Sequence, residues 1–200
     1  MIGILKIENS GNLFSLKQAL EFLNYKYFMI NNLSDINDCQ KIIIPGVGSY
    51  SNAMDYLNSN YNIQKLSDTL SNKPVLGICA GMQILSEFGY ENKKTKGLGL
   101  IKGSIKKINT KRVLPHVGFN SVIVENKTKL FSNIDELESE FYFTHSFELI
   151  SKTNTTSFCM YHENKIISSI EKDNIIGVQF HPENSRRQGI KLLDNFIKKY

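Results

Sequence analysis

The 200-residue sequence has few cysteines and no long apolar run. Its three cysteines, Cys39, Cys79 and Cys159, lie far apart and form no CxxC pair. This spacing matches neither a disulfide framework nor a zinc site, so we expect reduced thiols, a cytoplasmic location, no metal and no cofactor. No apolar run approaches the roughly 18 residues that span a bilayer, and we therefore expect no membrane segment.

The sequence also lacks the marks of export and of nucleic-acid binding. The N-terminal run MIGILKIENS is too short for a secretory signal and is better explained as a first buried strand. The net charge of +5 is mild, and the basic residues gather only in two small clusters, at 93–96 and 106–112, without interleaved aromatics. We expect solvated faces and no nucleic-acid partner, although an acidic protein or a phosphorylated small molecule would suit the same charges.

Internal repeats, low-complexity tracts and linkers rich in proline or serine are absent. A chain of this length suits one domain, which we place at 1–200. In its first half, apolar runs alternate with segments of helical spacing. Strands are expected at 2–7, 27–30, 41–44 and 74–78, and helices at 13–23, from Ser49, at 61–70 and at 82–88. This alternation predicts a parallel sheet covered by helices on both faces.

The second half of the chain has the pattern of short strands instead. We expect β-structure at 98–107, 112–115, 121–124, 140–145, 157–161, 165–170 and 175–179, followed by a helix at 186–199. The whole pattern predicts an α/β fold with a mostly parallel central sheet and a smaller mixed or antiparallel sheet.

The segment GICAG at 77–81 places a cysteine where a predicted strand meets a predicted helix. Glycines around Cys79 would let neighbouring backbones pass closely at such a strand–turn–helix elbow. The helix that follows would favour a thiolate, and the Ala80 N–H would face a developing oxyanion. The alternative is a buried structural cysteine between incidental glycines, because five residues are a weak signal.

A cysteine nucleophile needs a base, and the base needs an orienting group. His181 lies in GVQFHPEN at 177–184, and Glu183 follows it across a rigid proline. Cys79, His181 and Glu183 therefore make a complete set, although His181 alone is also explained as a capped histidine at a strand end. The loop PGVG at 45–48 could add a second oxyanion donor, or it could be a plain turn.

Six segments together resemble the class I glutamine amidotransferases: PGVGS at 45–49, GICAGMQ at 77–83, GLGL at 97–100, PHVGFN at 115–120, YFTHSF at 142–147 and GVQFHPE at 177–183. The match runs nearly end to end and keeps the order of the motifs. Three of the segments (GLGL, PHVGFN and YFTHSF) narrow the resemblance to the glutaminase subunit of imidazole glycerol phosphate synthase. The resemblance implies a flavodoxin-like central sheet.

The resemblance also implies a Cys-His-Glu triad that hydrolyses L-glutamine to glutamate and ammonia. Cys79 would form a γ-glutamyl thioester, His181 would protonate the departing ammonia and then activate water, and Glu183 would orient His181. The family's oxyanion hole falls on Gly46, Val47 and Ala80. Its glutamine-binding positions fall on Gly48, Gln83, Glu91, His145, Ser146 and Phe147.

Members of this family pass ammonia to a partner, which the resemblance implies here as well. The partner would be a (β/α)8 barrel synthase in a heterodimer, making imidazole glycerol phosphate and AICAR in histidine biosynthesis. Ammonia released into neutral water becomes ammonium, so channelling and partner-dependent activation make chemical sense. The PGVG loop is a candidate switch, because flipping one peptide would expose or hide an oxyanion donor.

Several positions depart from the pattern of the histidine pathway. Ala80 stands where leucine is usual, Phe119 where tryptophan is usual and Asn184 where lysine is usual, while IENSGN at 7–12 keeps only Gly11-Asn12 of its motif. We assign five residues to the partner surface: Asn12, Phe119, Asn120, Tyr142 and Asn184.

These departures leave other functions open. A paralogue could supply ammonia to a sugar-modifying enzyme that makes an acetamidino group in surface-polysaccharide or flagellin-glycan biosynthesis. A stand-alone γ-glutamyl cysteine hydrolase would have a similar elbow. A non-catalytic regulatory protein is a third alternative, against which the complete triad argues.

Overall fold

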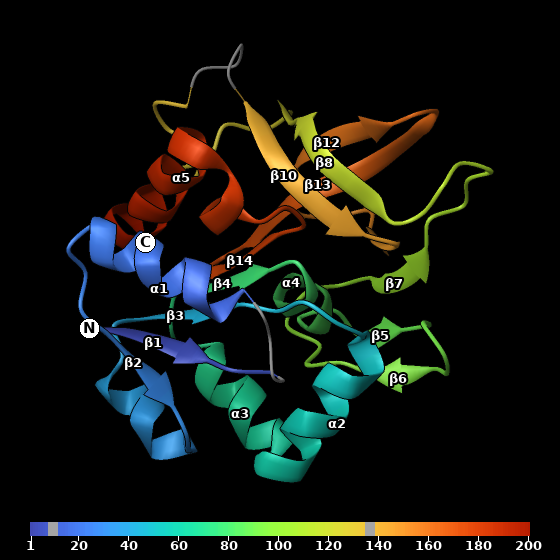
Figure 1. The fold of residues 1–200 in the computed structure, drawn as a ribbon. Helices are drawn as coiled ribbons and strands as arrows, with labels where there is room; N and C mark the ends of the chain where they lie inside the picture. The colour runs from blue at the N-terminus through green and yellow to red at the C-terminus, as the bar shows by residue number, and fades with distance from the viewer. Residues whose placement is uncertain (8–11, 135–138) are drawn as a thin grey trace.

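An eight-stranded sheet forms the centre of the computed structural model, which describes residues 1–7, 12–134 and 139–200 (Figure 1). Within the segment 7–12 singled out in the sequence, residues 8–11, Gly11 included, lie outside the described residues. The sheet has the order β2-β1-β3-β4-β14-β13-β12-β9. Its strands are β1 Ile2–Leu5, β2 Tyr27–Ile30, β3 Lys41–Ile44, β4 Val75–Ile78, β9 Ile123–Val124, β12 Thr155–Tyr161, β13 Asn164–Lys172 and β14 Ile175–Val178.

The sheet joins the two halves of the sequence. From β2 to β14 the neighbouring strands pair in parallel, whereas β13, β12 and β9 continue the sheet in antiparallel pairs. The strand β14 lies directly beside β4, with Gly177 opposite Gly77. The predicted α/β class with a mostly parallel centre is confirmed, and part of the expected antiparallel sheet proves to be an extension of the main one.

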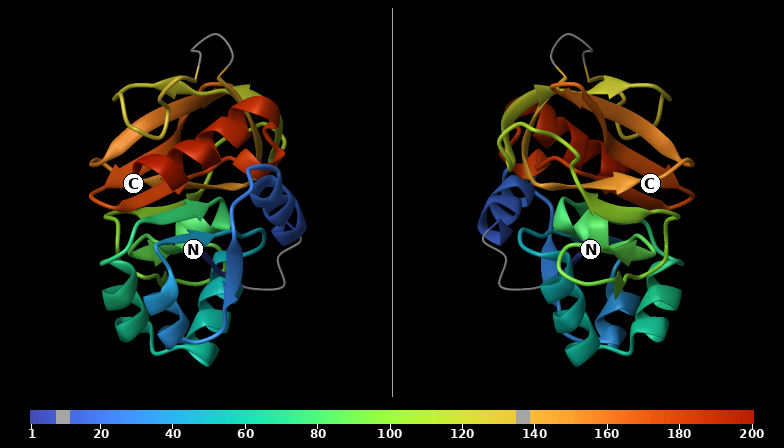
Figure 2. Two further views of the ribbon diagram at one scale, coloured as in Figure 1. Left: turned by 90° about the vertical axis from the view of Figure 1, so that its left-hand side faces the viewer. Right: turned by 90° about the vertical axis from the view of Figure 1, so that its right-hand side faces the viewer.

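Helices cover both faces of this sheet, as Figure 1 and the side views of Figure 2 show. One face carries α1 Leu13–Phe22 and α5 Arg186–Lys199, and the other carries α2 Tyr50–Asn60, α3 Ile63–Leu70 and the 3-10 helix η1 Leu33–Asp38. The side chains of β3 explain this layering. Ile42 and Ile44 pack with α2 and α3, while Ile43 packs with α1 and α5. Because this parallel strand is buried on both sides, the three isoleucines of its run KIII are all apolar in succession and do not alternate with polar residues.

Two smaller sheets lie next to the central one. The first pairs β8 His116–Ser121 with β10 Glu140–His145, and the second has the order β11-β7-β5-β6. The strands of the second are β5 Phe88–Gly89, β6 Thr95–Lys96, β7 Ser104–Lys107 and β11 Phe147–Ile150. Two short helices complete the described structure: α4 Ala80–Ile84 and the 3-10 turn η3 Pro182–Asn184.

Three predicted elements differ from the structure. The strand expected at 98–107 forms only at 104–107, as β7. The helix expected at 82–88 begins at Ala80 and ends at Ile84, because the chain turns back and the Leu98 N–H donates to the Ile84 carbonyl at 2.8 Å. The segment 112–115 forms no strand. Val113 there is 83% exposed, so the segment has no buried apolar face. Pro115 has no N–H to donate, so the segment also lacks one of the backbone hydrogen bonds that pair strands.

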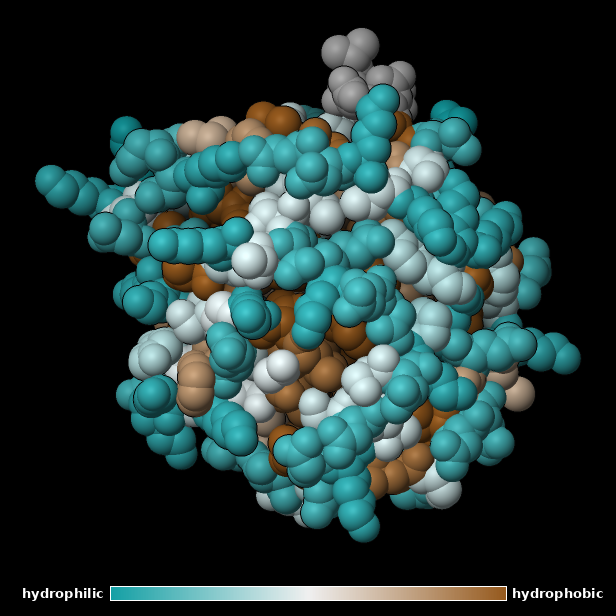
Figure 3. All heavy atoms as spheres, turned by 180° about the vertical axis from the view of Figure 1, so that it is seen from behind, coloured by the Kyte–Doolittle hydropathy of each residue, from teal (hydrophilic) through white to brown (hydrophobic). Residues whose placement is uncertain are grey.

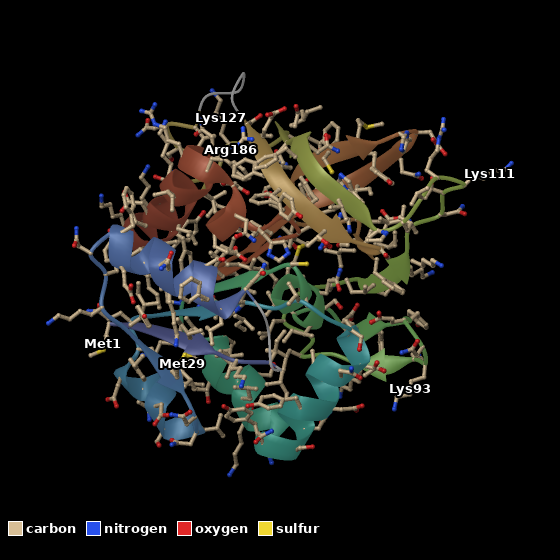
Figure 4. The ribbon with its side chains drawn as sticks, in the orientation of Figure 1. Met1, Met29, Lys93, Lys111, Lys127 and Arg186 are labelled. Carbon is tan, nitrogen blue, oxygen red and sulfur yellow. The ribbon has the colours of Figure 1, made fainter. Side chains whose placement is uncertain are left out.

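The molecular surface is largely polar. Figure 3 shows polar side chains over most of one face, with apolar atoms visible between them. Lys93 and Lys111, from the two basic clusters of the sequence, extend outward from separate loops (Figure 4). Within the described ranges, no helix is long and apolar enough to cross a membrane.

The packing of α4 against β3 depends on Gly81. A Cβ at this position would lie 1.8 Å from the Ile44 carbonyl oxygen, which is backbone and cannot move aside. We expect Gly81→Ala to lower the free energy of unfolding by about 3 kcal/mol or more, or to prevent folding, since overpacking is costly. The control Gly99→Ala, where a Cβ meets nothing within 4 Å but φ is +69°, should lose only about 1–2 kcal/mol. Equal losses in urea titrations of both variants would contradict this account.

Candidate active site

Cys79 connects β4 to α4 in a strained backbone conformation. Its φ is +52°, which is unfavourable for any residue with a side chain. The surroundings hold it there: the Cys79 N–H donates to the Val178 carbonyl at 2.8 Å, and the Gly77 Cα leaves room for the Gly81 backbone, which a Cβ would approach to 2.7 Å. The structure therefore contains the sharp elbow that GICAG predicts.

The chemically active side chains gather at one edge of the central sheet. Cys79 follows β4, His181 comes three residues after β14, and Gly46 comes two residues after β3. These three strands are neighbours and parallel, so their carboxyl ends meet, which is where open α/β sheets bind ligands. The strand β10 crosses above, since Tyr142 forms a bridge with His181 and the His181 N–H donates to the Tyr142 carbonyl at 2.8 Å.

A cavity of about 290 Å³ opens at this edge. Cys79 lies in its wall together with all six residues that the sequence assigns to glutamine binding and with Val47. The lining residues are Val47, Gly48, Cys79, Gln83, Glu91, Pro115, Thr144, His145, Ser146 and Phe147. A larger cavity, of about 570 Å³, lies elsewhere against Val122 and Phe131 and holds none of the triad residues.

His181 and Glu183 form a buried pair beside the sulfur. The Nδ1 atom of His181 lies 2.8 Å from Oε1 of Glu183, and both side chains are fully buried. Pro182 begins the η3 turn between them, and the Asn184 N–H closes that turn on the His181 carbonyl at 3.1 Å. The carboxylate thus fixes the imidazole through Nδ1 and leaves Nε2 for chemistry.

Burial opposes a charge on His181, but two anionic neighbours outweigh it. A Cys79 thiolate and the Glu183 carboxylate together raise the pKa of His181 above its ordinary value. The Nε2 atom is buried and has no hydrogen bond of ordinary geometry to a described residue. With Nδ1 held by Glu183, Nε2 is the nitrogen of His181 that remains for proton exchange.

Asn12 also belongs to this cluster, although the sequence predicts it on a partner surface. Its Nδ2 atom donates to Oε1 of Glu183 at 3.0 Å and lies 2.8 Å from Nδ1 of His181. Asn12 directly precedes α1, so a side chain at the start of that helix reaches a carboxylate 171 positions away in sequence. The contact ties the start of α1 to the buried pair of His181 and Glu183.

The backbone around Gly46 bears on the expected oxyanion hole. The Ala80 N–H, expected to face the oxyanion, donates to the Gly46 carbonyl at 3.3 Å. Gly46 is enclosed, since a Cβ there would lie 2.4 Å from the Ile7 side chain, whereas Gly48 adopts φ +125°. Val47 between them lines the cavity. Gly46, Val47 and Ala80, the residues expected to form the oxyanion hole, therefore lie next to one another. The Ala80 N–H is already bonded to the Gly46 carbonyl in this structure.

Among the expected glutamine-binding residues, Gln83 and Glu91 already have protein partners. The Nε2 atom of Gln83 donates to the Phe147 carbonyl at 3.1 Å, and Oε2 of Glu91 accepts from the Tyr50 N–H at 2.6 Å. Nδ1 of His145 lies 2.8 Å from the same Phe147 carbonyl. Two side chains therefore converge on one backbone group at the edge of the cavity.

The remaining expected partner residues lie on β8, on β10 and on the η3 turn. Phe119 is opposite Tyr142 across the β8–β10 pair, with ring centroids 5.6 Å apart, and the guanidinium of Arg186 lies 4.2 Å from the Phe119 ring centroid. Asn120 instead contacts Nε2 of His116 at 3.2 Å and donates to the Met160 carbonyl at 2.8 Å. Asn184 is half-buried in the turn after His181.

Two residues that touch the sulfur are not among those predicted from the sequence. Nε2 of Gln179 lies 3.6 Å from Sγ of Cys79, and Sγ lies 3.9 Å from the Thr144 carbonyl. Gln179 stands inside the GVQFHPE motif, so the motif contains the signal, but within that motif only His181 and Glu183 carry an obvious chemical role. The Thr144 contact uses a carbonyl and has no side-chain signature.

A chain of buried, neutral histidines connects the cavity to β8. Nδ1 of His116 lies 3.1 Å from Nε2 of His145. Burial is the main cause that lowers the pKa of His145 to about 3 and the pKa of His116 to about 4. Because Nδ1 of His145 donates to the Phe147 carbonyl, its Nε2 must accept from Nδ1 of His116. Neither nitrogen of His145 is then free to act as a second base in the cavity.

This pair makes stability depend on pH. In the unfolded chain both rings protonate near pH 6.5, but in the folded chain they stay neutral down to about pH 4, so the unfolded state binds more protons in between. Stability is therefore lost as the pH falls through this window, by at most about 1.4 kcal/mol per pH unit for each ring.

We expect His116→Gln to reduce this slope between pH 6.5 and pH 4.5, measured by urea titration at several pH values. The comparison with the unmodified chain cancels the contribution of His181, which has a raised pKa, acts in the opposite direction and is common to both proteins. Identical slopes in the two proteins would show that His116 is protonated in the folded state.

In the part of the chain that the structure describes, no group of three histidine, cysteine or acidic side chains could hold a metal ion. The side chains that the structure brings together beside the cavity are a cysteine, an imidazole and a carboxylate. Such a set can perform nucleophilic attack on a carbonyl followed by proton transfer to a leaving group.

Comparison with known proteins assigns this chain to a family. The family Glutamine amidotransferase class-I matches residues 8–200. The chain is 40% identical to the Imidazole glycerol phosphate synthase subunit HisH of Methanocaldococcus jannaschii, with 99% of each chain covered. It is 38% identical to the protein of that name from Pelagibacter ubique, with 94% of this chain and 95% of the relative covered.

Solved structures share the fold at lower identity. The structure of PurLQS from Thermotoga maritima has a TM-score of 0.74 and 21% identity, covering 98% of this chain and 97% of the other. A crystal structure of a glutamine amidotransferase has a TM-score of 0.73 and 14% identity, also covering 98% and 97%. With the elbow, the buried His-Glu pair and the family match over residues 8–200, the chain belongs to the class I glutamine amidotransferases.

Proposed function

We propose that the chain is the glutaminase subunit of an imidazole glycerol phosphate synthase and supplies ammonia for histidine biosynthesis. The observation that carries this proposal is the identity of 37–42% to several proteins named as that synthase's subunit HisH, extending over 92% or more of each protein. The site supplies the chemistry, and the similarity to these relatives supplies the pathway. Residues 1–200 would act as one amidotransferase domain in the cytoplasm.

The proposed reaction begins with the thiolate of Cys79. It attacks the side-chain amide carbon of L-glutamine bound in the 290 Å³ cavity, and a tetrahedral oxyanion forms. Nε2 of the His181 imidazolium then protonates the departing nitrogen, which leaves as ammonia, and a γ-glutamyl thioester remains. His181 next removes a proton from water, which attacks the thioester and releases glutamate. Glu183 holds the imidazole through Nδ1 in each step.

The oxyanion in this scheme requires donors that the present loop conformation withholds. The Gly46 carbonyl accepts the Ala80 N–H, and a flip of the Gly46–Val47 peptide would remove that acceptor and present the Val47 N–H instead. Such a flip would convert the resting enzyme to an active one. We propose that partner binding drives it, so that ammonia forms only when an acceptor enzyme is docked.

The proposed partner is a (β/α)8 barrel synthase, bound as a heterodimer over the carboxyl edge of the sheet. Phe119 is 38% exposed and is flanked by Tyr142 and Arg186, which offers an aromatic and cationic surface next to His181. Ammonia released from the tetrahedral adduct beside His181 would then enter the barrel without crossing bulk water, where it would be protonated.

The nucleophile is tested by Cys79→Ser. We expect glutamate release to fall by about 10³-fold or more, because an alcohol at this position lacks the ready thiolate on which the mechanism depends. Circular dichroism should show an unchanged fold, since the two side chains are close in size. The matched control Cys39→Ser changes a core cysteine that does not line the cavity and whose Sγ donates to the Asp35 carbonyl, and it should keep full activity. Full turnover by the Cys79 variant would remove the mechanism.

The partner is tested by adding the barrel synthase from the same cell to the purified chain. We expect glutamate release to rise by about 100-fold or more with the synthase and its ligand, because one oxyanion donor contributes about 10²–10³ in rate. The readout is glutamate formed per minute at saturating glutamine. Equal rates with and without the synthase would contradict the gating.

The pathway is tested by co-purification from the native cell and identification of the bound enzyme. A histidine-pathway barrel would support the proposal. A sugar-modifying enzyme would assign the chain to the paralogous route, for which the asparagine at position 184, in place of the usual lysine, is the sequence feature to follow.

A further inference from the structure

The side chain of Gln179 contacts two residues of the cavity wall, Cys79 and Gln83. It is fully buried and follows β14 directly. Its Nε2 atom is 3.6 Å from Sγ of Cys79, and its Oε1 accepts a hydrogen bond from Nε2 of Gln83 at 3.1 Å. Gln179 therefore contacts the reacting atom, a position that neither the triad nor the expected oxyanion hole accounts for.

The orientation of the Gln179 amide is fixed by its neighbours. Gln83 uses one amide nitrogen to donate to two acceptors, the Phe147 carbonyl and Oε1 of Gln179. A carbonyl can only accept, so the Gln83 nitrogen must face Phe147, and the Gln179 oxygen must face Gln83. The Gln179 nitrogen is then left facing the sulfur. The backbone of Phe147 thus determines which polar atom the nucleophile meets.

The Gln179 N–H interacts differently with the thiol and the thiolate forms of Cys79. The thiol can donate to the Thr144 carbonyl, whereas the thiolate can only accept, and Gln179 supplies an N–H in a pocket where Cys79 is 5% exposed. A hydrogen bond to a charged group in a buried site favours the charged form. His181 provides the opposite charge and Gln179 provides a directed hydrogen bond, so the two contributions are separate.

We propose that Gln179 is a further catalytic residue, whose side-chain N–H stabilises the Cys79 thiolate and whose direction is set by the Phe147 carbonyl through Gln83. The inference refines the proposed glutaminase site and rests on that function. The titratable groups of the described residues around the sulfur are His181 and Glu183 after β14, His145 at the end of β10 and Glu91 after β5.

The test is the pH profile of Cys79 alkylation by iodoacetamide in the full-length chain, followed by mass spectrometry of the Cys79 peptide. Gln179→Met keeps the size of the side chain and removes the donor. We expect the midpoint of its profile to move upward by about one to two pH units, as expected for one hydrogen bond to a charged group. Gln179→Glu, which places a carboxylate against the sulfur, should move the midpoint further upward. The exposed Gln64→Met serves as the matched control and should leave the midpoint unchanged.

A merely structural role for Gln179 would lower the melting temperature without moving the midpoint, and that result would overturn the inference. If Gln179→Met does not fold, Gln83→Met carries the test, because it releases the orientation of Gln179: a smaller upward shift supports the proposal and no shift overturns it. The assay contains no glutamine. A shifted midpoint in a chain that never hydrolyses glutamine would therefore overturn only the proposed function, and an active enzyme with an unmoved midpoint would overturn only this inference.

Discussion

The close approach of α4 to β3 at Gly81 is the contact on which the whole site depends. The Ile44 carbonyl occupies the space that any Cβ at position 81 would fill, so the first turn of α4 can lie directly against the end of β3. This contact brings the Gly46 loop to Ala80, and it allows Cys79 to be held at φ +52° in the wall of the cavity. A backbone strained in this way persists only because packing on both sides leaves it no alternative.

Much of the fold is predictable from the sequence because its signals are local. The runs YFMI and KIII and the helix at 186–199 have the bounds that the structure shows, since apolar spacing alone fixes such elements. The bounds of the short helix α4 are not predictable in this way, because tertiary contacts, in particular the Leu98 N–H on the Ile84 carbonyl, decide where it ends. The strand β11 is absent from the predicted elements because its Phe147–Ile150 segment carries no alternating pattern of its own.

The candidate site is predictable where chemistry requires particular side chains, as at Cys79, His181 and Glu183. It is less predictable where geometry assigns a role to a common residue. Asn12 and Gln179 are ordinary amides in sequence, and only the approach of α1 and β14 to the triad places them against Glu183 and the sulfur. The Gly46 carbonyl on Ala80 is not predictable at all, because a peptide orientation leaves no trace in residue identity.

The capture of Nδ1 of His181 by Glu183, with Asn12 alongside, has a consequence for the order of events. Only Nε2 is left to exchange protons, so in the proposed mechanism a single nitrogen must serve the sulfur, the departing ammonia and the incoming water in turn. Two of these cannot occupy the same lone-pair direction at once. In that mechanism the ammonia has to leave Nε2 before water can take its place, so its departure is a precondition for hydrolysis of the thioester.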